Sequence, residues 1–129
     1  LLLAAVLEKR GGLALGNKDI YIKVAGGASL KDPVTDLGIA LAMASSYHEH
    51  PTLPGSIIVG ELGLSGEVRS APYLNLRLKE ALKLGFSKAL IPKETRKEDT
   101  VGLDLAIYSV ETLEEALNYI GNGGWAFER

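Results

Sequence analysis

Residues 31–46 fit a helix that is apolar on almost every side, and an aspartate, Asp36, lies in its first turn. A carboxylate in this position can act as a catalytic group, and it can equally stabilise the exposed N–H groups of a helix start. The second effect contributes about 0.3–1 kcal/mol and would account for the residue by itself. Asp36 is therefore the first position to test for catalysis.

A second set of residues is basic. Between Arg69 and Lys97 the chain has eight basic and two acidic residues, a net charge of +6, whereas the whole chain has −2. A basic stripe on an acidic protein is typical of an anion-binding face, although a solvated helix face shows the same pattern. Tyr73 alone offers an aromatic ring here, so base stacking has little support. The residues that could neutralise phosphates, in a salt-dependent and largely sequence-blind way, are Arg69, Arg77, Lys79 and Lys83.

The remaining chemical motifs are weaker. His48 and His50 could suggest a metal, but two histidines two residues apart at a helix end point in different directions, and no third ligand is evident. The glycines in "VAGGAS" and "GELGLSGE" have neither the spacing of a dinucleotide fingerprint nor that of a P-loop. We expect no metal site and no nucleotide site in this domain.

Length and composition indicate one soluble domain, residues 1–129, with a single core. No apolar run reaches the ~18 residues that a membrane span needs, so we expect no membrane contact. The absence of cysteine suits a cytoplasmic protein. Because the chain begins without Met and part-way into a helical pattern, we expect it to be a piece of a longer protein.

The element pattern predicts an α+β fold. Residues 1–10 fit a leading helix, and the alternation in 19–27 fits a strand. A long core helix should begin at an N-cap, Asp32, and end near His50. A strand over 56–64 should then turn back at Ser65-Gly66 as a hairpin, and an amphipathic helix over 73–85 should follow it. After this helix we expect a buried strand "KALIP", a charged loop "RKED" and a strand "LAIYSV". The chain should close with a helix over 110–121, capped by Thr112 and ended by Gly121, and a loose tail over 122–129.

Several linked motifs resemble the proteolytic domain of Lon peptidases. These are "GELGLSGEVR", the amphipathic helix that follows it, "LGF" and "KALIP", together with "KDPVTDLGIALAMASS" upstream. In that family the upstream segment carries a nucleophilic serine, and the helix after the hairpin carries a catalytic lysine. The resemblance covers most of the chain and implies a Lon-like fold of mixed sheets packed with helices.

The resemblance places the two catalytic positions at residues that cannot do this chemistry. Alignment on "GIALA" puts the serine position at Asp36, and counting back from "KALIP" puts the lysine position at Asn75. The family needs a hydroxyl nucleophile and a neutral amine base, which a carboxylate and an amide cannot replace. The domain is thus expected to be non-catalytic. The enzyme alternative, a Ser/Thr–Lys peptidase, would use Thr35 and Lys79, which a shifted alignment could bring into those roles.

The sequence is similar in particular to the Lon-like domain, lacking this dyad, that closes the chain of a family of bacterial DNA-repair ATPases. The similar segments include "DLGIALAMASSYHEHP", "VGELGLSGEVR" and "RLKEALKLGF". This resemblance implies an upstream zinc finger and RecA-like ATPase, with Zn, ATP and Mg bound there and no cofactor in this domain. It also implies a hexameric ring that moves on single-stranded DNA and promotes branch migration, with the Lon-like domain scaffolding the ring.

Two roles remain open for the non-catalytic domain. The basic residues Arg69 and Arg77, with Lys79 and Lys83, could contact DNA. Alternatively, the domain is a pure oligomerisation module, in which the basic residues pair across subunits with the acidic residues of the last helix, Glu111, Glu114 and Glu115.

Overall fold

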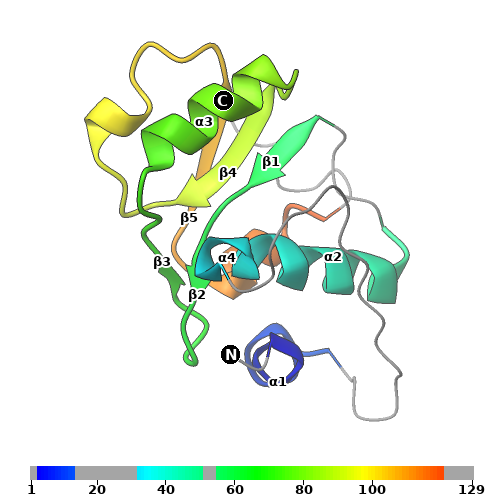
Figure 1. Cartoon of the computed structure of the whole chain (residues 1–129). Helices are drawn as coiled ribbons and strands as arrows, with labels where there is room; N and C mark the ends of the chain where they lie inside the picture. The colour runs from blue at the N-terminus through cyan, green and yellow to red at the C-terminus, as the bar shows by residue number, and fades with distance from the viewer. Residues whose placement is uncertain (1–2, 14–31, 51–54, 121–129) are drawn as a thin grey trace.

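The computed structural model describes residues 3–13, 32–50 and 55–120 (Figure 1). Its centre is a parallel sheet with the strand order β1-β4-β5, formed by Ser56–Ile58, Lys88–Pro92 and Ala106–Val110. A separate antiparallel pair consists of β2, Glu61–Leu62, and β3, Val68–Arg69. The predicted class, α+β with mixed sheets packed with helices, is confirmed. The predicted strand over 19–27 and the tail over 122–129 lie outside the described residues.

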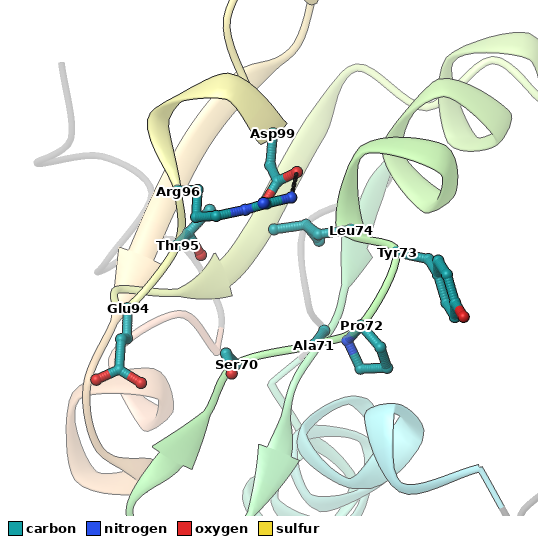
Figure 2. A pocket seen from close by; sticks show the side chains of 9 residues that line it. All are labelled: Ser70, Ala71, Pro72, Tyr73, Leu74, Glu94, Thr95, Arg96 and Asp99. Atoms are coloured by element: carbon teal, nitrogen blue, oxygen red, sulfur yellow. Dashed lines mark hydrogen bonds and ion pairs between the residues drawn. The ribbon is translucent and has the colours of Figure 1, made fainter.

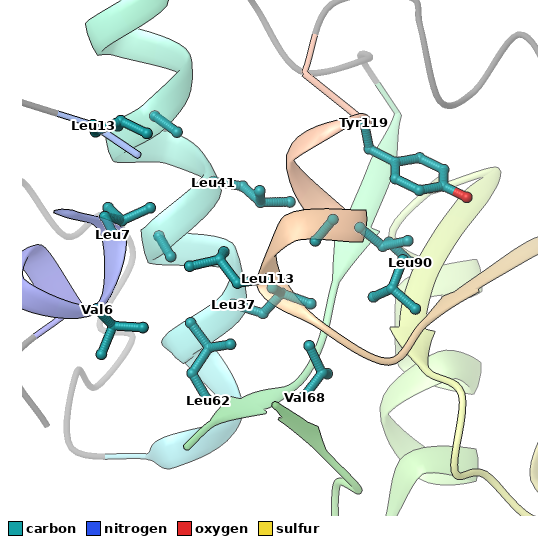
Figure 3. Close-up of a cluster of buried hydrophobic side chains, with 14 residues drawn as sticks. Val6, Leu7, Leu13, Leu37, Leu41, Leu62, Val68, Leu90, Leu113 and Tyr119 are labelled. Carbon is teal, nitrogen blue, oxygen red and sulfur yellow. The ribbon is translucent and has the colours of Figure 1, made fainter. Parts of the chain in front are cut away.

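Helices cover both faces of the parallel sheet, because successive residues of a strand point to opposite faces. On one face, Ala89 and Ile91 of β4 pack against Leu74 and Leu78 of α3, Leu74–Lys83. On the other face, Leu90 packs into a larger cluster (Figure 3). That cluster is completed by side chains of α1, Leu3–Gly11, α2, Asp36–His48, and α4, Leu113–Leu117.

The long helix begins at the predicted N-cap, but its first turn is a 3₁₀ turn and not part of the α-helix. Asp32 is the N-cap, and its Oδ1 accepts a hydrogen bond from the N–H of Val34 at 3.2 Å. The first turn, Pro33–Thr35 (η1), is a 3₁₀ turn, and α2 follows it directly. The helix ends at His48, because the next residue, Glu49, adopts the left-handed conformation with φ 57°.

The prediction of one continuous strand over 56–64 is wrong. The chain leaves the parallel sheet after β1, and Gly60 pairs instead with the start of the long helix: its N–H donates to Val34 O at 2.9 Å, and its C=O accepts from Leu37 N at 3.0 Å. A side chain would be crowded here, since a Cβ on Gly60 would lie 3.0 Å from Cγ1 of Val68 and 3.3 Å from Cδ2 of Leu37. The break is therefore set by contacts with residues distant in sequence.

The predicted hairpin is present and is held by two sets of contacts. At its turn, the Glu67 carboxylate accepts hydrogen bonds from Ser65 N at 3.1 Å and from Nη2 of Arg69 at 2.9 Å. Between the turn and β3, Val68 N donates to Glu111 O at 2.8 Å, and Leu113 N donates to Gly66 O at 2.8 Å. The hairpin is thus joined by main-chain bonds to the start of α4.

The C-terminal elements are shorter than predicted. Thr112 caps α4 in a capping box with Glu115, as the sequence suggests, but the helix ends at Leu117. The following N–H groups bond three residues back, as in Asn118 N to Glu115 O at 3.1 Å, so the chain tightens into turns. Gly121 lies outside the described residues. The predicted "RKED" loop contains one 3₁₀ turn, η2, at Lys97–Asp99.

We expect Gly60→Ala to lower the free energy of unfolding by about 1–3 kcal/mol, because the added methyl group overpacks the contact with Val68 and Leu37. Gly38→Ala, within α2, is the matched control. A Cβ there meets only ordinary contacts, the nearest being Ile58 O at 3.5 Å, so this change should be neutral or stabilising. Urea denaturation of both variants measures the difference. Equal stability of Gly60→Ala and wild type would show that the break at Gly60 does not depend on close packing.

Candidate functional site

Asp36, the predicted nucleophile position, binds a neighbouring strand rather than its own helix. Its Oδ2 accepts a hydrogen bond from Leu62 N in β2 at 3.2 Å, and Leu62 itself is buried. Asp32 already caps the preceding turn, and the residue before α2, Thr35, makes no side-chain cap bond to it. The interpretation of Asp36 as the cap of its own helix is therefore corrected: the carboxylate connects α2 to the hairpin.

The surroundings of Asp36 raise its pKa above the ordinary value of 3.8. Partial burial is the largest cause, and the hydrogen bond from Leu62 opposes it. The charges of Glu61 and Asp32 add to the rise. The charged form of Asp36 is thus less favourable here than in the unfolded chain.

Asn75, the predicted lysine position, also makes a bond to the main chain. Its Nδ2 donates to Asp99 O at 3.1 Å, which connects the first turn of α3 to η2. The two predicted dyad positions are thus each used in a separate structural contact, with no hydrogen bond between them among the described residues.

The alternative pair is not brought together by any bond either. The Thr35 hydroxyl donates to Asp32 O at 2.8 Å, and Lys79 is exposed on α3. Within the described residues no hydrogen bond joins Thr35 to Lys79, so nothing here activates the hydroxyl. A peptidase based on this pair stays a prediction.

The four predicted phosphate-binding residues fall into two classes. Arg77 is engaged: its Nε donates to Pro72 O at 2.9 Å, and its Nη1 lies 3.4 Å from Oδ2 of Asp32. Arg69 pairs with Glu67 at 2.9 Å, and its side chain is 53% exposed. The pKa of Glu67 is lowered, first by its own backbone amide and then by Arg69. Lys79 and Lys83, in contrast, are exposed and have no ion pair in the described part of the chain.

Ion pairs reduce the basic excess that the sequence shows. Half of the eight basic residues between positions 69 and 97 pair with carboxylates outside that window, in the pairs Arg69–Glu67, Arg77–Asp32, Lys93–Glu111 and Arg96 with Glu98 and Asp99. Exposed pairs of this kind contribute only about 0–1 kcal/mol, so a phosphate could displace a carboxylate at small cost. In the described part of the chain, Lys79 and Lys83 of α3 have no carboxylate partner that a phosphate would have to displace.

A cavity of about 350 Å³ lies between the segment that leads into α3 and the segment after β4 (Figure 2). Arg96 spans it and pairs with Asp99 at 3.2 Å, and this carboxylate is the main cause that raises the pKa of Arg96. Glu94 adds a negative charge to the lining, so the cavity has no positive excess. The lining residues are Ser70, Ala71, Pro72, Tyr73, Leu74, Glu94, Thr95, Arg96 and Asp99.

Tyr73, at the start of α3, has an unusual backbone and an exposed side chain. Its φ and ψ are 56° and 35°, a left-handed conformation that bulky residues rarely adopt. The side chain is 75% exposed and points away from the cavity (Figure 2). The sequence shows the aromatic residue but gives no sign of this conformation, which sequence patterns associate with Gly or Asn.

The histidines of "HEH", His48 and His50, are both exposed. Within the described ranges, no group of three or more His, Cys, Asp or Glu side chains could hold a metal ion. In the same ranges no helix is long and apolar enough to cross a membrane.

Comparison with known proteins gives two results. A family model described as "Subunit ChlI of Mg-chelatase" matches residues 3–95. The chain is also similar to DNA repair protein RadA of Streptococcus pneumoniae, with 45% identity over 92% of this chain, and of Listeria monocytogenes, with 46% over 90%. The chain spans about a quarter of the length of these curated relatives, 28% and 25% respectively.

The contact between Asp36 and Leu62 predicts opposite effects for two substitutions. Asp36→Ala leaves the buried Leu62 N–H without an acceptor and should lower the free energy of unfolding by about 1–3 kcal/mol. Asp36→Asn keeps an acceptor oxygen and removes the charge. Since the pKa of Asp36 is raised on folding, the folded state binds the proton more tightly, and wild-type stability falls as pH rises from the unfolded pKa through the folded one.

Asp36→Asn should therefore be as stable as wild type at low pH and slightly more stable at pH 7. Denaturation midpoints from pH 3 to pH 7 measure this difference. If Asp36→Asn loses stability relative to wild type as pH rises, then the ionised carboxylate is a net stabilising group and the assignment is wrong.

Proposed function

The chain belongs to the family described as subunit ChlI of Mg-chelatase, and from this premise we propose that it is a domain of a DNA-repair protein that contacts DNA and scaffolds an assembly without being an enzyme itself. The observation that carries the DNA-repair assignment is the similarity to RadA proteins, at 43–46% identity over at least 90% of this chain. This similarity extends along nearly the whole chain, beyond the residues that the family model matches.

A Lon-like fold is part of the proposal. It is supported by the order of elements after β1: a hairpin of β2 and β3, then α3, then the buried strand β4 that ends at Pro92. The non-catalytic character is supported by the two dyad positions, since Asp36 and Asn75 are each bonded to a backbone group and neither can supply a hydroxyl or a neutral amine.

DNA contact is assigned first to Lys79 and Lys83. These side chains are exposed on α3, four residues apart, and thus lie on neighbouring turns of one helix. Arg69 joins them at small cost, because its pair with Glu67 is exposed to solvent. The guanidinium of Arg77 is committed to Pro72 and Asp32, so its contribution to DNA binding is indirect.

The whole protein would add what this chain does not contain. We infer an upstream zinc finger and RecA-like ATPase that bind Zn, ATP and Mg, a hexameric ring on single-stranded DNA, branch-migration activity and a cytoplasmic location. These follow from the family resemblance and the similarity to RadA, of which this chain spans about a quarter.

A pure assembly module is the second candidate, because the described surface has several large apolar side chains that are more than half exposed. Examples are Leu64 on the hairpin, Leu76 and Leu84 near the two ends of α3, and Val101. Such side chains suit a contact between copies of the chain, and acidic residues of α4 such as Glu114 could pair with the lysines across that contact.

The test is binding of the 129-residue chain to labelled single-stranded and double-stranded DNA across a salt series, with its oligomeric mass measured alongside. We expect log K to fall linearly with log[salt]. Lys79→Ala and Lys83→Ala should each weaken single-strand binding and reduce the magnitude of the slope by about 0.7, the value for one lost phosphate contact. Lys93→Ala is the control, since Lys93 pairs with Glu111 away from α3.

Three results would change the proposal. Unchanged slopes in both α3 variants would remove these lysines from the DNA contact. Absence of DNA binding by a defined ring or dimer would favour the assembly module. Cleavage of an unfolded substrate that is lost in Thr35→Ala would establish the peptidase instead.

A further inference from the structure

Tyr73, the residue directly before α3, and Leu76, in the first turn of that helix, are two exposed apolar side chains, and we call the two together the platform. They are 75% and 64% exposed. Most proteins bury a tyrosine ring or hydrogen-bond it, and an exposed apolar patch commonly marks a binding surface. The backbone of Tyr73 borders the cavity, but its ring points away from the other lining side chains (Figure 2).

The backbone of Tyr73 has a conformation that is unfavourable for a residue with a large side chain. Its left-handed φ of 56° is one that a glycine would adopt without strain. Such strain persists only where the surrounding structure imposes it, and it concentrates at functional sites. Beside this residue, the guanidinium of Arg77 donates to the carbonyl of Pro72, directly before Tyr73, and to Asp32 at the start of the long helix.

Charge on the same helix indicates the kind of partner. With a rise of 1.5 Å and a turn of 100° per residue, Lys79 and Lys83 lie roughly 4.5 and 10.5 Å along the axis of α3 from Leu76, and about 60° and 20° from it around the axis. Both lysines are exposed and without ion pairs in the described residues, and Glu80 is the acidic residue between them. An aromatic ring followed by unpaired cations is the arrangement that binds a single strand, with bases stacked and phosphates neutralised.

We propose that Tyr73 is a stacking platform for a base of single-stranded DNA and that Arg77 is the residue that positions it. This inference rests on the proposed DNA contact and adds a base contact to it. Arg77 then contributes without touching a phosphate, since its donors already bind Pro72 and Asp32. A second copy of the chain seated on Tyr73 and Leu76 is the competing occupant, and it would have to cover two lysines.

The test compares two probes with the 129-residue chain: a short labelled oligo-dT and an abasic oligonucleotide of the same length and charge. Wild type should bind oligo-dT more tightly than the abasic strand. Tyr73→Ala should lose about tenfold in affinity for oligo-dT, a typical loss for one stacked base, with no change for the abasic strand or in the salt slope. Tyr73→Phe should retain wild-type binding, because the ring is kept.

Controls separate stacking from folding. Leu84→Ala, at the other end of α3 and 72% exposed in wild type, should bind like wild type. Tyr73→Gly should raise the melting temperature, because glycine fits the left-handed backbone, while it loses the preference for oligo-dT. Arg77→Ala should lose the same preference with an unchanged salt slope, whereas a phosphate contact at Arg77 would reduce the slope.

The outcomes are distinct. Equal affinity of wild type for the two probes, or a preference that survives Tyr73→Ala, overturns the stacking role and leaves the DNA contact by lysines intact. No binding of either probe overturns both. A concentration-dependent rise in oligomeric mass that Tyr73→Ala abolishes, without any effect on DNA binding, assigns the platform to a second copy of the chain.

Discussion

The pairing of Gly60 with the first turn of the long helix is the interaction on which the remaining structure depends. Two main-chain bonds to Val34 and Leu37 turn the chain out of the parallel sheet, and the Asp36 carboxylate extends the contact to Leu62. Only because the chain turns here can β2 and β3 form a hairpin away from the sheet. That hairpin then reaches the start of α4, and the segment after it leads into α3. The helix start is therefore joined to Gly60 by main-chain bonds and to the hairpin by the Asp36 carboxylate.

If the proposed Lon-like fold is right, the contacts of Asp36 and Asn75 show how a domain could lose a catalytic pair and keep its structure. In the Lon-like interpretation, Asp36 and Asn75 occupy the two catalytic positions, and both side chains bond to a main-chain group of a neighbouring element. A buried N–H such as that of Leu62 needs an acceptor, so the carboxylate meets a structural requirement. Partial burial, and to a smaller extent the charges of Glu61 and Asp32, raise the pKa of Asp36.

Local signals predicted most of the elements, and long-range contacts account for the errors. The caps Asp32 and Thr112 and the turn at Ser65-Gly66 depend on residues within a few positions, so the sequence reveals them. The break at Gly60 depends on Val34, 26 positions away, and a strand pattern cannot show it. The candidate site follows the same rule. The exposed lysines of α3 were predicted correctly as a helix face, whereas the pairing of Arg77 with Asp32 joins two separate elements. The left-handed Tyr73 has no sequence signal, because the residue type argues against it.

The packing of α1 against α4 has a consequence for the order in which the chain folds. Val6 and Leu7 of α1 share one core cluster with Leu113 and Ala116 of α4, so the two ends of the described chain close the same core. Contacts over so many residues require a long loop to close before they stabilise anything, and they slow folding. During synthesis the larger core therefore stays open until α4 has left the ribosome, whereas the cluster on the α3 side of the sheet is complete at Ile107, before α4 begins. The face covered by α3 can thus form first and serve as the template on which the rest of the domain closes.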